Sequence, residues 1–277
     1  MHNVTANGAT IPALGFGTFR IPGSDVLRIV PHALKVGFRH VDTAQIYGNE
    51  AEVGEAIANS GVARGDIFLT TKVWVENYGH DAFIKSVDES LKKLKTDYVD
   101  LLLLHWPNEA VSLAEQIGAL NEVKEAGKVR HIGVSNFNTE LMAESVKLSR
   151  APIVTNQIEY HPYLSQDVVI AAARKAGMSV TGYFGMADGK VFNDPVLRDI
   201  GARHGKSVAQ VVLRWLVQQE GVIALSKTVG EARVLENFAI FDFALSADEM
   251  AAIHALAVPG GRIVSPDGLA PVWDKAA

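Results

Sequence analysis

Gly37-Phe-Arg-His-Val-Asp-Thr-Ala-Gln-Ile-Tyr-Gly-Asn-Glu50 is the stretch that says most about the fold of this chain. Its first part, Arg39 to Asp42, has the length of a short strand and ends in a carboxylate. Tyr47 follows five residues later, where the pattern changes to that of a turn entering a helix. A strand followed at once by a helix is the unit from which parallel α/β sheets are built.

The same alternation continues along the chain. The predicted strands are Leu14 to Phe16, Arg39 to Asp42, Ile67 to Val73, Tyr98 to His105, Val129 to Val134, Ile153 to Ile158, Ser179 to Tyr183 and Val222 to Leu225. The predicted helices include Asp25 to Lys35, Asp81 to Leu94, Leu113 to Glu125, Gln166 to Lys175, an extra helix Asp194 to His204, and Val208 to Gln219. This order implies right-handed crossovers and a parallel sheet, either closed into a barrel or open and doubly wound.

Polar residues at the strand ends favour the barrel. They are Asp42, Lys72, His105, Ser135, Asn136, Gln157, Tyr183 and Lys227, each at or just past the C-terminal end of a predicted strand. A closed barrel gathers its active site at that face. We therefore predict an α/β fold, a (β/α)8 TIM barrel, as a single domain over residues 1–277.

Two additions to the barrel are expected. Val4 to Ala6 and Ala9 to Ile11 flank Asn7-Gly8, a pair suited to the tight turn of a β-hairpin. The tail, Pro259 to Ala277, is rich in Gly, Pro and charged residues, and we expect it to fold across the active-site face.

Composition narrows the function classes. The chain has 277 residues, 48% hydrophobic and 21% charged, which suits a globular domain with a large core. A net charge of −5 argues against nucleic acid as a general partner, and no apolar run is long enough to span a membrane. There is no cysteine, so disulfides and thiolate chemistry are excluded, and no signal peptide is recognised. We expect a cytoplasmic monomer acting on a small molecule.

Asp42, Tyr47, Lys72 and His105 together fit proton donation to a carbonyl oxygen. Tyrosine is protonated at neutral pH but donates poorly, and a nearby ammonium lowers its pKa. In this interpretation Tyr47 is the general acid, Lys72 lowers its pKa, Asp42 keeps Lys72 charged, and a neutral His105 orients the carbonyl. Each residue alone has an ordinary explanation, such as a helix cap for Asp42 or core packing for His105. Their joint occurrence at successive strand ends favours catalysis.

The segments around these residues resemble the aldo-keto reductases. The resemblance rests on Gly-Phe-Arg-His-Val-Asp-Thr-Ala, on Thr-Lys72-Val-Trp74 and on His105-Trp106-Pro107, and it extends over essentially the whole chain. It implies a barrel enzyme that reduces carbonyls with NADPH and carries its catalytic tetrad at these four positions. Within the family, the chain most resembles the bacterial 2,5-diketo-D-gluconic acid reductases, through Asp42-Thr-Ala-Gln-Ile-Tyr47 and Val264-Ser-Pro-Asp-Gly-Leu-Ala-Pro-Val-Trp-Asp274.

A Rossmann-type cofactor loop is not predicted, because Gly15-Phe-Gly17-Thr-Phe-Arg20 lacks the third glycine. Hydroxyl and amide groups at adjacent strand ends can instead bracket a carboxamide. The resemblance assigns Ser135, Asn136 and Gln157 to the nicotinamide carboxamide and Tyr183 to stacking on the ring. The other expected cofactor contacts are Gly17, Thr18, Phe19, Asp42, Phe184, Gly185 and Met186. Taken singly, Ser135-Asn136 would equally suit a helix cap.

The segment Ser226 to Asn237 suggests a phosphate clamp at a helix start. The resemblance assigns it to the adenosine 2′-phosphate, which implies NADPH over NADH, with contacts from Lys227, Thr228, Arg233, Glu236 and Asn237. Ser226 and Gly230 depart from the family's usual residues, as does the run Tyr183-Phe-Gly-Met186. The alternative is an ordinary helix start with a surface arginine.

Aromatic and apolar residues are expected to form the substrate pocket, namely Phe19, Ala44, Ile46, Trp74, Trp106 and Trp273. Such walls suit small carbonyls, including 2,5-diketo-gluconate, methylglyoxal and β-keto esters. Two other functions stay open: a Schiff-base aldolase with Lys72 as nucleophile, and a module that binds and senses nicotinamide nucleotides. No metal site is expected, since the nine histidines show no metal-binding spacing.

Overall fold

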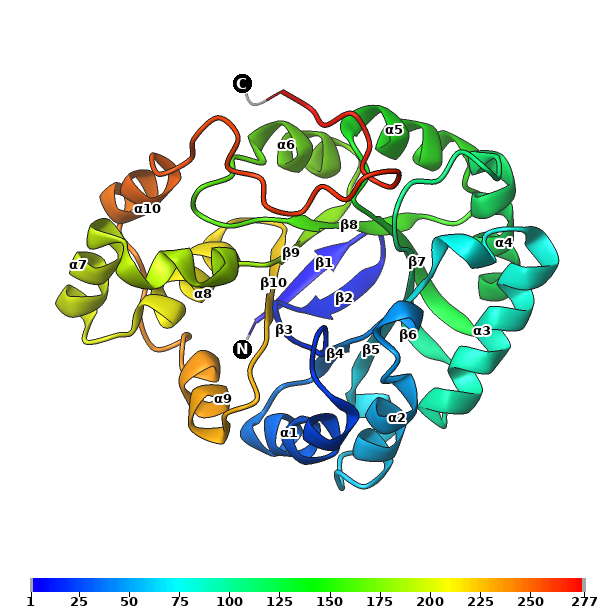
Figure 1. Cartoon of the computed structure of the whole chain (residues 1–277), viewed down its shortest axis with the longest axis horizontal. Coiled ribbons are helices and arrows are strands. Elements are labelled where there is room, and N and C mark those ends of the chain that lie inside the picture. The colour runs from blue at the N-terminus through cyan, green and yellow to red at the C-terminus, as the bar shows by residue number, and fades with distance from the viewer. Residues whose placement is uncertain (1, 276–277) are drawn as a thin grey trace.

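The computed structural model describes residues 2–275 and contains a closed barrel of eight parallel strands (Figure 1). The strands are β3 (Leu14–Gly17), β4 (His40–Asp42), β5 (Phe68–Val73), β6 (Val99–Leu104), β7 (Val129–Ser135), β8 (Ile153–Glu159), β9 (Ser179–Tyr183) and β10 (Val222–Ser226). Each pairs with its neighbour in sequence, and β10 closes the ring against β3. The barrel prediction is confirmed, and the open doubly wound sheet is excluded.

Helices surround the barrel (Figure 1). They are α1 (Gly23–Val36), α2 (Glu50–Ala58), α3 (His80–Leu94), α4 (Leu113–Glu125), α5 (Thr139–Leu148), α6 (Asp167–Lys175), α7 (Pro195–His204), α8 (Val208–Gln218), α9 (Glu231–Phe238) and α10 (Ala247–His254). Four 3₁₀ segments lie between them: η1 (Gln45–Tyr47), η2 (Arg64–Asp66), η3 (Val75–Asn77) and η4 (Ala187–Asn193).

The extra helix before α8 was predicted from sequence, and its boundaries have local causes. Asp194 accepts hydrogen bonds from the backbone of Val196 and Leu197, and Pro195 occupies the first turn of α7. Ser207 and Gln210 then form a reciprocal capping box at the start of α8. Both helices therefore begin at residues that satisfy otherwise unpaired backbone N–H groups.

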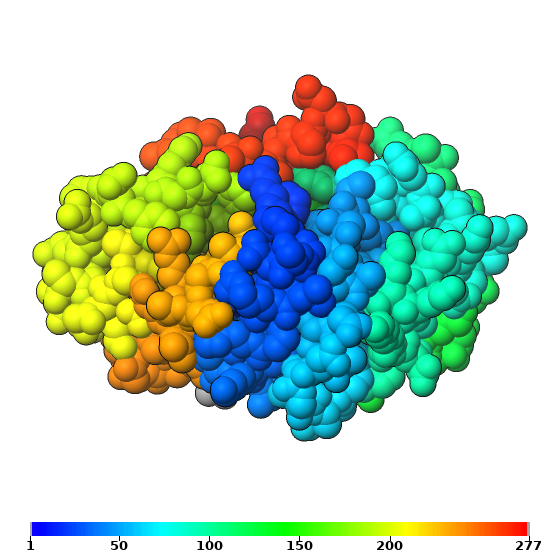
Figure 2. Space-filling model, turned by 60° about the horizontal axis from the view of Figure 1, so that its bottom comes forward, coloured from blue at the N-terminus to red at the C-terminus, as the bar shows by residue number. Residues whose placement is uncertain are grey.

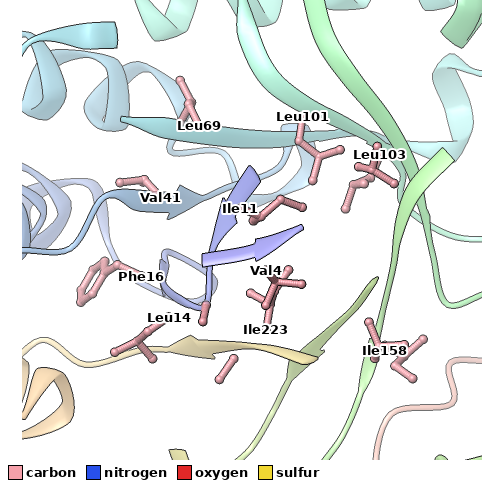
Figure 3. Close-up of a cluster of buried hydrophobic side chains, with 14 of the residues drawn as sticks. Val4, Ile11, Leu14, Phe16, Val41, Leu69, Leu101, Leu103, Ile158 and Ile223 are labelled. Atoms are coloured by element: carbon pink, nitrogen blue, oxygen red, sulfur yellow. The ribbon is translucent and has the colours of Figure 1, made fainter. Parts of the chain in front are cut away.

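The N-terminal hairpin closes the barrel end opposite the carboxyl ends of the strands. It pairs β1 (Asn3–Ala6) with β2 (Ala9–Pro12) through a turn in which Asn7 and Gly8 both have positive φ, 44° and 85°. The Asn7 side chain donates to the carbonyl of Ile153, the first residue of β8. In Figure 3, Val4 and Ile11 of the hairpin lie among the buried side chains of the barrel strands.

The C-terminal tail follows α10 and contributes Val264, Pro266 and Leu269 to the wall of a large cavity. In Figure 2 the surface is hollowed between the blue N-terminal segment and the yellow-green segments, with the red tail along the upper edge. The tail therefore covers part of the active-site face, as predicted.

No helix within residues 2–275 is long and apolar enough to cross a bilayer. The expectation that residues 1–277 form a single domain stays a prediction.

Candidate functional site

A cavity of about 830 Å³ lies at the carboxyl ends of the barrel strands. Most of the residues singled out from sequence line it: Gly17, Phe19, Asp42, Ile46, Tyr47, Trp74, His105, Trp106, Ser135, Asn136, Gln157, Tyr183, Phe184, Gly185, Met186, Lys227, Thr228, Arg233, Glu236 and Asn237. Parallel strands bring these groups to one face because all eight carboxyl ends point the same way.

Lys72 lies beneath the cavity floor with its side chain fully buried. Its ammonium Nζ is 2.6 Å from Asp42 Oδ1, 2.8 Å from the Thr43 carbonyl oxygen and 3.2 Å from the Tyr47 hydroxyl. The other carboxylate oxygen, Asp42 Oδ2, accepts from Gln157 Nε2 at 2.8 Å. The ion pair is thus surrounded by hydrogen-bond partners, as a buried pair requires.

The surroundings of Tyr47 correct one expectation. We expected the Lys72 ammonium to lower the pKa of the phenol. Instead, burial and then the negative charge of Asp42 raise the pKa of Tyr47 well above its ordinary value. Burial also lowers the pKa of Lys72, although the Asp42 charge opposes this. The Tyr47 phenol is therefore protonated throughout the neutral range.

His105 follows β6 directly, and its imidazole lies beside two other rings. The ring centroids are 5.7 Å from Tyr47 and 5.3 Å from Trp74, both edge to face. Burial, with a smaller effect from the Lys72 charge, lowers the pKa of His105 well below its ordinary value. Its Nδ1 has no hydrogen-bond partner within residues 2–275. A neutral imidazole of this kind can orient a carbonyl without adding charge.

A cluster of hydroxyls and amides adjoins the tetrad. Ser135 Oγ donates to the Gln157 carbonyl, and Asn136 Nδ2 donates to the His105 carbonyl at 3.0 Å. The Tyr183 hydroxyl donates to Asn136 Oδ1 at 2.7 Å. The N-cap of α5 is Asn138, so the alternative of Ser135-Asn136 as a helix cap is excluded.

The opposite end of the cavity is cationic. Lys227 and Arg233 are exposed there, and neither forms an ion pair with any described residue. They flank Gly230, the N-cap of α9, which has no side-chain cap. Free backbone N–H groups and two unpaired cations make this end suited to an anionic group.

The loop after β9 forms a further part of the wall and has a strained backbone. Phe184, Ala187 and Asp188 have positive φ angles of 63°, 46° and 55°, a region that residues with a side chain seldom adopt. The sequence predicted Phe184, Gly185 and Met186 at the cavity. It missed other lining residues: Asp188, Gly189, Phe192, Ser207, Ala209 and Leu225, which carry no recognisable motif, and Arg20 and Ser226, which lie in segments that it considered but were not named as contacts.

Three expected contacts do not line the cavity. Thr18 is fully buried, and its hydroxyl donates to the Asp42 carbonyl. Ala44 is fully buried next to the η1 turn. Trp273 lies behind Trp106, with ring centroids 6.4 Å apart, and its ring stacks on the Arg262 guanidinium at 3.6 Å. Sequence order placed these residues near the site but could not show which way they point.

The tail is held over the cavity at two points. Glu159, fully buried at the end of β8, accepts backbone hydrogen bonds from Ile263 at 2.7 Å and Val264 at 2.9 Å. Asp274 accepts from the backbone N–H and hydroxyl of Thr139. Glu159 was not predicted as a functional residue, because its partners lie more than 100 positions further along the chain.

No group of three potential metal-binding side chains occurs in the described part of the chain.

Comparison with known proteins identifies the family. Residues 13–258 match the Aldo/keto reductase family. The chain belongs to the aldo/keto reductase family. It is 46% identical to methylglyoxal reductase DkgB of Salmonella typhimurium over 96% of this chain and 100% of the relative. It is 39% identical to glyoxal reductase of Bacillus subtilis over 90% of each chain.

Solved structures agree with this assignment. A protein assigned as a 2,5-diketo-D-gluconic acid reductase B is 70% identical and superposes with a TM-score of 0.99, over 99% of this chain and 98% of that one. An aldo/keto reductase from Brucella melitensis is 44% identical, with a TM-score of 0.86, over 92% of this chain and 98% of that one. The resemblance to this family noted from sequence is therefore confirmed.

Proposed function

We propose that this protein reduces small aldehydes and ketones to alcohols with NADPH, and that Tyr47 donates the proton. The observation that carries the proposal is the position of Lys72 Nζ, bonded to both Asp42 and the Tyr47 hydroxyl on the floor of the cavity. Family membership supports carbonyl reduction. NADPH, the role of each residue and the substrates are our inference.

The cavity fits an elongated dinucleotide. It reaches from the Tyr47 and His105 rings to the unpaired cations Lys227 and Arg233. Ser135, Asn136 and Gln157 would hold the nicotinamide carboxamide, Tyr183 would pack on its ring, and Lys227, Thr228 and Arg233 would hold the phosphate. When bound, NADPH supplies the hydride.

Tyr47 is held in the donor form that the reaction needs. Its proton stays on oxygen at rest because burial and the Asp42 charge raise the pKa of the phenol. As the proton moves to the carbonyl oxygen, negative charge develops on the phenolic oxygen, 3.2 Å from the Lys72 ammonium. Lys72 therefore stabilises the phenolate as it forms, and Asp42 fixes the lysine in place.

His105 and the aromatic walls orient the carbonyl. A neutral imidazole can donate a hydrogen bond to the carbonyl oxygen beside Tyr47. Phe19, Trp74 and Trp106 provide an apolar enclosure for the rest of a small substrate. Together with the names of the relatives, this favours small dicarbonyls such as methylglyoxal and 2,5-diketo-gluconate, and β-keto esters.

The geometry disfavours a Schiff-base aldolase. A nucleophilic lysine must reach the substrate as a free amine. Lys72 is fully buried and its ammonium has three acceptors, one of them a carboxylate. Trapping of a substrate on the protein by borohydride would restore this alternative.

The test follows NADPH absorbance with the purified protein against methylglyoxal, 2,5-diketo-gluconate and a β-keto ester, with NADH in parallel. The proposal predicts consumption that depends on the carbonyl and is faster with NADPH. Binding of NADPH, seen as quenched tryptophan fluorescence, without turnover of any carbonyl would instead favour a nucleotide-sensing module.

A further inference from the structure

Gln45 is the first residue of the η1 turn, and its side chain is partly buried between the barrel and α3. The turn is a single 3₁₀ segment that also contains Tyr47. It starts from an extended Ala44 and ends at Gly48, whose φ is 69°. A segment this short has little stability of its own, so the direction of the Tyr47 side chain depends on contacts outside the turn.

The Gln45 amide anchors the turn itself, whereas the Tyr47 side chain also contacts the Lys72 ammonium and the Phe19 and His105 rings. Its Nε2 donates to the hydroxyls of Ser86 and Ser90 on α3, at 3.1 and 3.2 Å. Its Oε1 accepts from the backbone N–H of Trp74 at 2.9 Å and from Asn77 Nδ2 at 3.0 Å. Two donors and two lone pairs are all used, and because the Trp74 N–H can only donate, the amide has one orientation.

These bonds connect two residues on either side of His105. Gln45 holds the turn that carries Tyr47, and it also holds the backbone of Trp74. The Tyr47 and Trp74 rings both lie edge-on to the His105 imidazole. One amide thus determines the spacing of the proton donor and the substrate wall.

Two residues of the wall also border a second, solvent-open pocket, so they are not fully packed on that side. A second, smaller cavity of about 180 Å³ is lined by Ile46 and Trp74, which also line the large cavity. Gln45, Ser86 and Ser90 line the smaller cavity too. Without the amide bonds, Ile46 and Trp74 could move into this space and Tyr47 would move with its turn.

We propose that Gln45 is a positioning residue that holds Tyr47 and Trp74 at their distances from His105. This inference rests on the proposed carbonyl reduction. It predicts that Gln45 acts on kcat through Tyr47 and on KM through Trp74, without touching the substrate itself.

The test variant is Gln45→Met, which keeps the length of the side chain and removes its hydrogen bonds. Because a displacement of about 1 Å can cost up to a hundredfold in rate, we expect kcat to fall by about tenfold or more. KM should rise more for phenylglyoxal, whose larger ring would depend more on the aromatic wall that includes Trp74, than for methylglyoxal. The NADPH dissociation constant should stay unchanged.

The matched control is Gln218→Met. Gln218 is also partly buried and makes three hydrogen bonds, with Arg214 and with both backbone groups of Leu245, but it does not line either cavity. This variant should lose stability and leave kcat and KM unchanged. Asn77→Ala removes one bond from the Gln45 amide, and it should give a smaller effect in the same direction as Gln45→Met.

Hydrogen exchange supplies a readout independent of turnover. In Gln45→Met, exchange should accelerate at the Trp74 amide and across residues 45–47, whereas in Gln218→Met it should accelerate at Leu245. The positioning role would be overturned if Gln45→Met matched Gln218→Met both in its kinetic constants and in the exchange rate of the Trp74 amide. If the wild-type protein turned over no carbonyl, the proposed function would be overturned. Faster exchange of the Trp74 amide in Gln45→Met would still show that Gln45 holds the Trp74 backbone.

Discussion

At the scale of single residues, two charges near the Tyr47 hydroxyl act in opposite directions. Asp42 favours the protonated phenol, and Lys72, 3.2 Å away, favours the phenolate. In the resting site burial and Asp42 dominate, so the proton is retained. In the proposed reduction, the Lys72 charge would become decisive when the phenol gives its proton to the substrate, because only then does a phenolate exist to be stabilised.

At the same scale, one prediction concerns the preference for NADPH over NADH. Replacing Arg233 with Ala should raise the dissociation constant for NADPH about tenfold, since a charge-assisted hydrogen bond contributes about 1.5–3 kcal/mol. The constant for NADH should change little. Fluorescence titration of both cofactors measures this.

Arg28→Ala is the matched control for that experiment. Arg28 is also exposed and close to α9, but it is paired with Asp25 and Glu231 and does not line the cavity. It should leave both dissociation constants unchanged. Equal losses for NADPH and NADH in Arg233→Ala would remove Arg233 from the 2′-phosphate site.

At the scale of elements, the tail that follows α10 forms part of the cavity wall, and its described residues contain no helix or strand. Its position depends on the Glu159 carboxylate, which accepts from two consecutive backbone N–H groups, and on Asp274 near the other end. Between these anchors, Pro266 and Leu269 line the cavity. Side-chain hydrogen bonds from Glu159 and Asp274, and one from Asn138 to the Val272 carbonyl, thus replace secondary structure in fixing the wall.

Glu159→Gln should loosen this wall. The amide nitrogen cannot accept a hydrogen bond, so one partly buried backbone N–H loses its partner, at a cost of about 1 kcal/mol. KM for carbonyl substrates should rise, while the NADPH dissociation constant stays the same.

Asp274→Asn serves as the graded comparison for the tail, because Asp274 holds only its far end. It should raise KM less than Glu159→Gln does. Unchanged KM in both variants would mean that the tail does not contact the substrate.

At the scale of the whole molecule, the barrel followed from the sequence because short strand-like segments alternate with helical patterns and most of them are followed closely by a polar residue. Asp42, Lys72 and His105 lie where the strand ends placed them. How deeply each side chain is buried could not be predicted in the same way. The pKa of Tyr47 is an example, because it depends on burial by packing from several elements. The direction in which a side chain points could not be predicted from its position in the sequence either, as Trp273 and Gln45 show.

The burial of His40 in the barrel allows a prediction of how the stability of the protein depends on pH. Burial lowers the pKa of His40 in β4 from 6.5 to about 4. Below pH 6.5 the unfolded chain therefore binds a proton at this residue that the folded protein does not, and stability falls as pH falls. Between pH 7 and 5 this residue alone should cost about 2 kcal/mol.

Urea unfolding at pH 7 and pH 5 measures that loss. His40→Gln should show a pH dependence smaller by about that 2 kcal/mol, because glutamine does not titrate. An identical pH dependence in both proteins would show that His40 is not held neutral by the fold.

The most direct test of the central claim is the turnover of Tyr47→Phe, which removes only the hydroxyl that we assign as proton donor. The account predicts that kcat for methylglyoxal falls by at least about a hundredfold, with an unchanged NADPH dissociation constant. A variant that binds NADPH and turns over at a near-normal rate would contradict the account, since the proton would then come from another group.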